Sequence, residues 1–400
     1  MACTLMGDQT LPVRVLMLSH YFAERRGGIE AVAAALARQL TERGFQVLWL
    51  ASGDPTSTPE GIDYLLGTLP ASSIAERMLG IPYPILRSSA WRKIYRESAR
   101  HDVILIHDTL YMTSILGYLA ARARRKPLVI VQHVAFVPFT RALLRGLMRV
   151  ANRLITVPLL RSADQVVFIS QLTLQHFAHI RWRRAPLLIF NGVDTTAFRP
   201  PADSAQVVDE RRKLDLPAQA PVALFVGRFV EKKGLRVLEQ LARLRADMLF
   251  VCAGHGPLDP RGWQLSNVRV YSGLYGAELA ALYRASNVLV LPSVGEGFPL
   301  VVQEGLACGI AVVCGRDTAS ADERATPLLD SVAVDPRDPL ATAGRFAAEL
   351  RRLQECAWRQ AERRQRAEFA RASYSWSASG ARYADILQRL CAPLTAPLRR

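Results

Sequence analysis

Short, uninterrupted apolar runs recur along this chain, and amphipathic segments with a helical period separate them. The run Val13–Leu18 precedes a segment, Ile29–Arg43, whose apolar residues recur every three or four positions. Gly44 ends that predicted helix, and a second apolar run follows. Runs that are apolar at every position are typical of parallel strands covered on both faces. The predicted strands are Val13–Leu18, Gln46–Ala51, Val103–Ile106, Leu128–Val131, Val166–Ile169 and Leu187–Phe190 in the first half, and Val222–Val226, Met248–Cys252, Val268–Tyr271, Val288–Leu291 and Ala311–Cys314 in the second.

The pattern starts again after a polar, proline-bearing stretch between Arg199 and Pro221. Two such series predict an α/β protein with two doubly wound, Rossmann-like domains that face each other across a cleft. We place the N-terminal domain at residues 1–200 and the C-terminal domain at residues 201–375. Residues 376–400 are predicted to form a C-terminal helix that is able to return to the N-terminal domain.

Composition and charge limit what the chain does. Half of its 400 residues are hydrophobic and 22% are charged, which excludes intrinsic disorder. No run of 18 apolar residues occurs, so neither a transmembrane helix nor an export signal is expected. The six cysteines form no CxxC pair and no zinc-ligand spacing, which predicts a reducing compartment, the cytoplasm. The net charge of +16 predicts an acidic partner, such as phosphates, nucleic acid or an anionic membrane.

The strongest chemical signal begins at Leu291, where a predicted strand ends. A turn that carries Glu296 and Gly297 follows, and Pro299 suits the first position of a helix. The unpaired backbone N–H groups of such a helix start are suited to an anionic ligand. Glu304 lies on the same helix, with seven residues between it and Glu296. Because carboxylates accept hydrogen bonds from hydroxyl groups, this segment predicts a sugar at one end and a ribose at the other.

This segment resembles the E-x7-E element of the retaining glycosyltransferases with the GT-B fold, of the family 4 type. Four further segments resemble other motifs of that family, and they occur in the family's order. They are Gly27-Gly28-Ile29-Glu30, Asn191-Gly192-Val193-Asp194 with Phe198 and Pro200, Gly227-Arg228 with Lys233-Gly234, and Ala253-Gly254-His255-Gly256-Pro257-Leu258. The motifs span residues 13 to about 335, so the resemblance covers most of the chain.

The resemblance implies a retaining transfer of a sugar from a nucleotide sugar, without a metal or another cofactor. Arg228 and Lys233 follow a strand end and are expected to bind the diphosphate, where fixed cations stabilise the charge on the departing nucleotide. Ordinary surface charge is the alternative for this pair. Glu296 is expected to bind the sugar hydroxyls and Glu304 the ribose.

Two further predictions concern glycines and a histidine. Gly27 and Gly28 follow the first strand, where the backbone can approach a ligand closely; a plain strand-to-helix turn is the alternative. By resemblance, His133 occupies the place of the family's active-site histidine near the transferred sugar; a structural histidine is the alternative. His107, with Asp108 beside it, is a weaker candidate on the acceptor side. The predicted catalytic residues are Arg228, Lys233, Glu296 and His133. The predicted donor-binding residues are Gly27, Gly28, Arg228, Lys233, Glu296, Gly297, Phe298 and Glu304.

A basic, acid-free span lies between Asp108 and Asp164. Four of its arginines share one helical face because they recur every four residues: Arg141, Arg145, Arg149 and Arg153. A basic amphipathic helix of this kind predicts binding to an anionic membrane surface. A helix packed on its own domain is the alternative. Nucleic acid is not an expected partner, because no recognisable nucleic-acid-binding motif is present.

The predicted enzyme is a hexosyltransferase that uses a UDP- or GDP-linked donor. Its acceptor is expected to be a lipid-linked saccharide in cell-envelope polysaccharide assembly, held by the N-terminal domain at the inner face of the cytoplasmic membrane. One alternative is a nucleotide-sugar-binding peripheral membrane protein without turnover. The other is an NAD-type oxidoreductase, which would require a G-x-G-x-x-G turn after a strand; the sequence has none.

Overall fold

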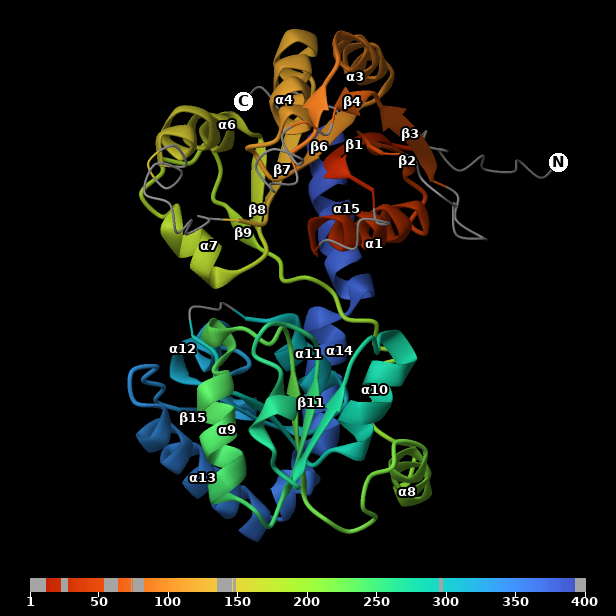
Figure 1. The fold of residues 1–400 in the computed structure, drawn as a ribbon. Helices are drawn as coiled ribbons and strands as arrows, with labels where there is room; N and C mark the ends of the chain where they lie inside the picture. The colour runs from red at the N-terminus through yellow and green to blue at the C-terminus, as the bar shows by residue number, and fades with distance from the viewer. Residues whose placement is uncertain are drawn as a thin grey trace, which may run out of the picture. The chain divides into compact units, whose positions relative to one another are not determined.

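The computed structural model describes residues 12–22, 28–53, 64–72, 74, 83–134, 146, 149–294 and 298–392. The chain packs as two compact units, each built around a parallel sheet (Figure 1). Unit 1 consists of Met1–Ile169, Thr173–Ile189 and Gly380–Arg400. Unit 2 consists of Ser170–Leu172 and Phe190–Ser379.

The sheet of unit 1 has seven strands within the described residues, and all of them run parallel. The first strand, β1, lies between β2 and β6, so the strand order reverses there. Ligands of doubly wound sheets bind outside the carboxyl ends of the strands at such a reversal. In order across the sheet, the strands are β3 (Leu65–Leu69), β2 (Gln46–Ser52), β1 (Arg14–Tyr21), β6 (Val103–His107), β7 (Leu128–Gln132), β8 (Gln165–Phe168) and β9 (Leu187–Leu188). A separate antiparallel pair joins β4 (Ala71–Ser72) and β5 (Ile85–Leu86).

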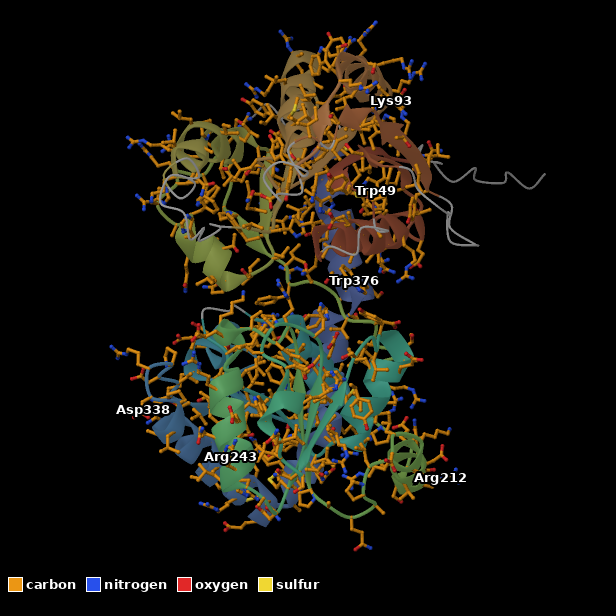
Figure 2. The ribbon with its side chains drawn as sticks, in the orientation of Figure 1. Trp49, Lys93, Arg212, Arg243, Asp338 and Trp376 are labelled. Atoms are coloured by element: carbon orange, nitrogen blue, oxygen red, sulfur yellow. The ribbon has the colours of Figure 1, made fainter. Side chains whose placement is uncertain are left out.

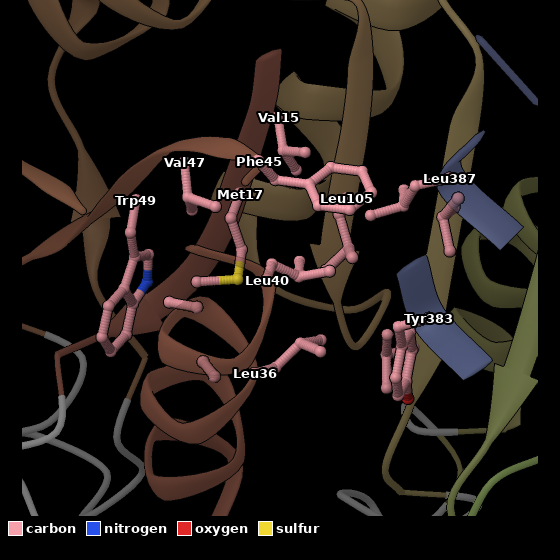
Figure 3. Packing of buried hydrophobic residues seen from close by; sticks show 14 of the residues in the cluster. Val15, Met17, Leu36, Leu40, Phe45, Val47, Trp49, Leu105, Tyr383 and Leu387 are labelled. Carbon is pink, nitrogen blue, oxygen red and sulfur yellow. The ribbon is translucent and has the colours of Figure 1, made fainter. Parts of the chain in front are cut away.

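Successive residues of β1 enter two different hydrophobic cores, because side chains alternate between the faces of a sheet. Val15 and Met17 pack in the core that α1 and α15 cover (Figure 3). Leu16 and Leu18 pack in the core on the other face, which α3, α4 and α6 cover. The helices and helical turns of this part of the chain are α1 (Gly28–Thr41), α3 (Ser88–Arg100), α4 (Met112–Arg124), the π-helical turn η2 (Asn152–Thr156), α6 (Val157–Ser162), α7 (Gln171–His176) and α15 (Trp376–Cys391).

The last helix, α15, begins in unit 2 and completes the core of unit 1. From Gly380 onwards its residues belong to unit 1. Tyr383 and Leu387 are buried in the same core as Met17 (Figure 3). Ile386 is buried there as well. At Gly380, a Cβ atom would lie only 2.7 Å from Cβ of Gln39 in α1, so this glycine lets the two helices approach closely.

The sheet of unit 2 has six parallel strands within the described residues. Numbered from the first strand of the unit, their order is 3-2-1-4-5-6, as in nucleotide-binding folds. Across the sheet they are β12 (Val268–Tyr271), β11 (Leu249–Ala253), β10 (Val222–Val226), β13 (Val288–Leu291), β14 (Ala311–Gly315) and β15 (Asp330–Val332). The helices of the unit are α8 (Ser204–Lys213), α9 (Leu235–Leu244), α10 (Gly276–Ala285), α11 (Leu300–Ala307), α12 (Arg316–Ala319), α13 (Pro339–Glu355) and α14 (Arg363–Tyr374). Side chains of both units are drawn in Figure 2, where Trp376 marks the start of α15.

Candidate active site

The carboxyl edge of the unit 2 sheet is formed by loops that press closely on one another. A Cβ atom at Gly254 would lie 1.9 Å from the backbone oxygen of Gly227. Gly234 has φ +75°, and a Cβ atom there would lie 2.3 Å from the backbone oxygen of Pro292. Only glycine fits at these two positions, so the loops after β10, β11 and β13 meet at one edge.

The two cations predicted to bind the diphosphate lie at this edge. Arg228 is exposed and makes no ion pair with any described residue. The half-buried side chain of Lys233 runs along Gly227, where a Cβ atom would lie 3.6 Å from its Cε. The backbone N–H of Val294, in the loop that leads to α11, donates a hydrogen bond of 3.0 Å to the carbonyl oxygen of Lys232. The loop that carries the cations is therefore tied to the segment that contains the predicted sugar site.

Glu304 lies on α11 and is buried. Its Oε2 accepts a hydrogen bond of 2.7 Å from the hydroxyl group of Tyr283, on α10, and no described residue donates to Oε1. Burial raises the pKa of Glu304 to about 7, although the hydrogen bond from Tyr283 opposes this shift. The structure thus adds Tyr283, which sequence reasoning missed, as the residue that orients Glu304.

The other predicted donor-binding residues differ in what the structure says of them. The Phe298 ring is buried against Phe190 and Tyr374, with both ring centroids 5.3 Å away, so it contributes to the core of unit 2. Gly28 is the first residue of α1. Gly27, Glu296 and Gly297 lie outside the described residues.

A pair of histidines lies at the carboxyl edge of the unit 1 sheet. Nδ1 of the buried His107 is 3.0 Å from Nε2 of the half-buried His133. Burial lowers the pKa of both rings, that of His133 to about 3, so both are neutral at pH 7. Nε2 of His107 has no partner among the described residues. Since orphaned buried N–H groups are rare, the proton of His107 lies on Nδ1 and is donated to His133. His133 then carries its own proton on Nδ1, where it can be donated to a hydroxyl group.

A second histidine site lies at the same edge, on β1. Nε2 of the buried His20 lies 3.0 Å from Oε1 of Glu30, and its ring stacks on Tyr111 with centroids 3.8 Å apart. Sequence reasoning did not single out His20. Its position at the carboxyl end of the strand at which the order reverses was the available signal.

Buried polar residues link this edge of the sheet to the π-helical turn η2, which contains Arg153. Asp108 has φ +64°, and its Oδ1 accepts a hydrogen bond of 2.6 Å from Gln132. Burial raises the pKa of Asp108 to about 6. The Thr109 hydroxyl lies 3.1 Å from both Gln132 Oε1 and the hydroxyl of Thr156 in η2, which in turn bonds Asn152. This polar network, together with the partly buried Ile155, therefore holds the turn against the sheet.

The predicted basic face is described only in part. Arg141 and Arg145 lie outside the described residues, whereas Arg149 and Arg153 are exposed. Val150 and Leu154 are 53% and 68% exposed, whereas Ile155 is partly buried against the core of unit 1, as the helix-packing alternative expects. No helix in the described part of the chain is both long and apolar enough to cross a membrane.

Comparison with known proteins identifies the family. A model of Glycosyltransferase Family 4 matches residues 26–197, and a model of Glycosyl transferases group 1 matches residues 220–353. The chain belongs to the family 4 glycosyltransferases. It is therefore a transferase that moves a sugar from a nucleotide sugar to an acceptor, and the oxidoreductase alternative is wrong.

Relatives of this family 4 glycosyltransferase include two curated enzymes. The D-inositol 3-phosphate glycosyltransferase of Streptosporangium roseum is 28% identical, over 90% of this chain and 88% of its own. The GDP-mannose-dependent alpha-(1-6)-phosphatidylinositol monomannoside mannosyltransferase of Mycolicibacterium smegmatis is 27% identical, over 93% and 98% of the two chains. The structure of Anabaena HepE in complex with UDP-glucose is 17% identical and superposes with a TM-score of 0.67, over 94% of this chain and 99% of that one. The predicted GT-B fold is confirmed.

Proposed function

We propose that this family 4 glycosyltransferase transfers a hexose from a UDP- or GDP-linked donor with retention of anomeric configuration and without a metal ion. The observation that carries the proposal is the tie between the Arg228–Lys233 loop and the segment that leads to α11. It supports a cationic clamp, fixed before the reaction, at the point where negative charge develops on the departing diphosphate. Two such cations take the place that a metal ion has in other transferases.

Glu304 and Glu296 hold the two ends of the donor in this proposal. Tyr283 engages Oε2 of Glu304, so Oε1 remains to accept a hydrogen bond from a ribose hydroxyl. Glu296 binds hydroxyl groups of the sugar. Gly27 and Gly28 let the backbone approach the donor closely, and Gly297 and Phe298 complete the set of donor-binding residues.

His133 is the proposed contact to the transferred sugar. As the neutral partner of His107, it offers an N–H to a sugar hydroxyl and orients the ring for attack. We assign it no role as a base, because burial lowers its pKa to about 3.

The proposed acceptor is a lipid-linked saccharide of cell-envelope polysaccharide assembly, reached at the inner face of an anionic membrane. Two observations support it. The exposed Val150 and Leu154 alternate with the exposed Arg149 and Arg153, a pattern that suits a membrane surface. In addition, the M. smegmatis relative is named for a phosphatidylinositol mannoside substrate.

A donor panel tests the proposal. UDP-glucose, UDP-N-acetylglucosamine, GDP-mannose and, as a control, NAD are screened for thermal stabilisation and then for hydrolysis without acceptor. One nucleotide sugar is expected to stabilise and to be hydrolysed slowly, and NAD to do neither. NMR of the released sugar reports its anomeric configuration: inversion overturns the retaining assignment, and loss of turnover in EDTA overturns metal independence. Binding without hydrolysis or transfer would favour the non-catalytic alternative.

A further inference from the structure

A second group of cations lies at the opposite edge of the unit 1 sheet. Lys126 comes two residues before β7, and Asp164 comes directly before β8, so both mark the amino ends of these strands. His133 follows β7 at its other end. A strand of five residues spans about 16 Å. The group is therefore distinct from the candidate active site.

Lys126 and Asp164 line a cavity of about 470 Å³. The segments around it are the end of α4 with the turn that follows, the loop before β9 and the end of α15. Its lining contains six basic side chains, Arg122, Arg125, Lys126, Arg183, Arg184 and Arg389, and one carboxylate, Asp164.

The carboxylate is already engaged. Oδ2 of Asp164 accepts a hydrogen bond of 2.9 Å from the backbone N–H of Leu128, and Oδ1 pairs with Arg183 at 3.2 Å. Arg389 pairs with Asp385 at 2.7 Å. The four remaining cations make no ion pair with any described residue: Arg122, Arg125, Lys126 and Arg184.

Local structure alone does not account for this concentration of charge. The negative end of α4 favours a cation in its last turn, which explains Arg122. Arg184 comes from a segment remote in sequence, and it adds to the repulsion between the unpaired like charges around one cavity. A bound anion would remove that repulsion.

We propose that this cavity binds a multivalent phosphorylated anion that is neither the donor nor the acceptor of the transfer reaction. Guanidinium groups match phosphate oxygens in pairs, and five of the six cations are arginines. The volume falls within the range of small-molecule sites. The same phosphate chemistry occurs in soluble polyphosphates and in the array of headgroups that an anionic phospholipid surface presents. This inference does not depend on the proposed acceptor or on the roles of Arg228 and Lys233.

The test uses sodium triphosphate as the probe in calorimetric titrations of the full chain. In the cavity variant, Arg122, Arg125, Lys126 and Arg184 are changed together to Gln. In the matched control, four exposed arginines of unit 2 are changed to Gln: Arg212, Arg243, Arg261 and Arg337. A third protein, Arg228→Ala with Lys233→Ala, removes the proposed donor cations. Vesicles of phosphatidylcholine, with and without phosphatidylglycerol, form a separate arm.

The cavity variant is expected to bind triphosphate at least about tenfold more weakly than wild type, while the control and the Arg228/Lys233 variant keep a saturable site. Donor hydrolysis by the cavity variant is expected to be unchanged. If triphosphate does not bind but phosphatidylglycerol-dependent vesicle binding is lost in the cavity variant alone, the headgroup is the source of the phosphate. Equal weakening in the cavity and control variants, or no weakening in either, would overturn the proposal.

Discussion

The hydroxyl group of Tyr283 donates a hydrogen bond of 2.7 Å to Glu304, and this contact joins α10 to α11 through two buried side chains. It leaves one carboxylate oxygen of Glu304 without a donor among the described residues. The free oxygen is the feature on which the ribose assignment depends.

Above pH 7, where Glu304 is ionised, Glu304→Gln is expected to weaken donor binding by about tenfold or more, because it replaces an anionic acceptor with a neutral amide. Tyr283→Phe is the matched control, since it removes the hydrogen bond but keeps the carboxylate. Donor affinity measured by calorimetry should fall further in the first variant than in the second. Unchanged donor affinity in Glu304→Gln would contradict the ribose role.

The raised pKa of Glu304 also predicts how the free energy of unfolding depends on pH. Its pKa rises from the ordinary value of 4.5 to about 7 in the fold, so between these pH values the folded chain holds a proton that the unfolded chain has lost. The contribution of Glu304 to the free energy of unfolding therefore decreases as pH rises from 4.5 to about 7, by about 3 kcal/mol in all, and is constant above. Denaturant unfolding of wild type and Glu304→Gln across this range measures the difference. The exposed Glu278, changed to Gln, serves as control.

Arg228→Ala and Lys233→Ala are each expected to lower turnover by about 10²–10³, because each removes a cation from the leaving group. Neither should change the melting temperature by much, since Arg228 is exposed and Lys233 half-buried. Lys232→Ala is the control: it removes an exposed lysine next to Lys233 and should keep nearly full activity. Near-normal turnover of either clamp variant at saturating donor would show that the diphosphate assignment is wrong.

His133→Ala is expected to lower turnover about tenfold, the effect of one lost hydrogen bond to a sugar hydroxyl. The exposed His179, changed to Ala, should have no effect. Because burial lowers the pKa of His133 to about 3, wild-type turnover should show no ionisation of this residue near pH 6.5. A change in turnover with an apparent pKa near 6.5, present in wild type and absent in His133→Ala, would contradict the neutral histidine pair.

Changing Arg141, Arg145, Arg149 and Arg153 together to Gln is expected to reduce sedimentation with anionic vesicles. Each basic residue near such a surface contributes about 1 kcal/mol, and the attraction should weaken in 1 M salt, where the Debye length is about 3 Å. The four-arginine control of unit 2 described above should bind as wild type does. Equal binding to neutral and anionic vesicles would count against the membrane proposal.

Buried strands were predictable from sequence because they are apolar at every position, and β10 begins and ends where it was predicted to. The prediction ended β1 at Leu18, whereas the strand continues to Tyr21 through two buried polar residues. One of them, Ser19, is satisfied by the indole N–H of Trp49 at 2.8 Å, a partner that only the folded chain reveals. The edge strand β3 was missed because Gly67 and Thr68 interrupt its apolar residues, which suits a strand that is only partly buried.

In the candidate site, too, residues marked by local sequence could be predicted, whereas those that depend on tertiary packing could not. Arg228 and Lys233 could be found because they lie close in sequence to a strand end and to each other. Tyr283 could not, since 20 residues separate it from Glu304 and its role depends on the packing of α10 against α11. His20 acquires its partners, Glu30 and Tyr111, only when β1, α1 and the loop before α4 come together.

The course of α15 has a consequence for biosynthesis. Tyr383, Ile386 and Leu387 belong to the core of unit 1, yet they are made after every residue of unit 2. The first 189 residues therefore leave the ribosome with part of an apolar sheet face uncovered, while unit 2 has all its residues once Ser379 has emerged. The half that is synthesised second is thus the first able to finish folding, and a nascent chain that stops at Ser379 should be recognised by chaperones through its unit 1 sheet.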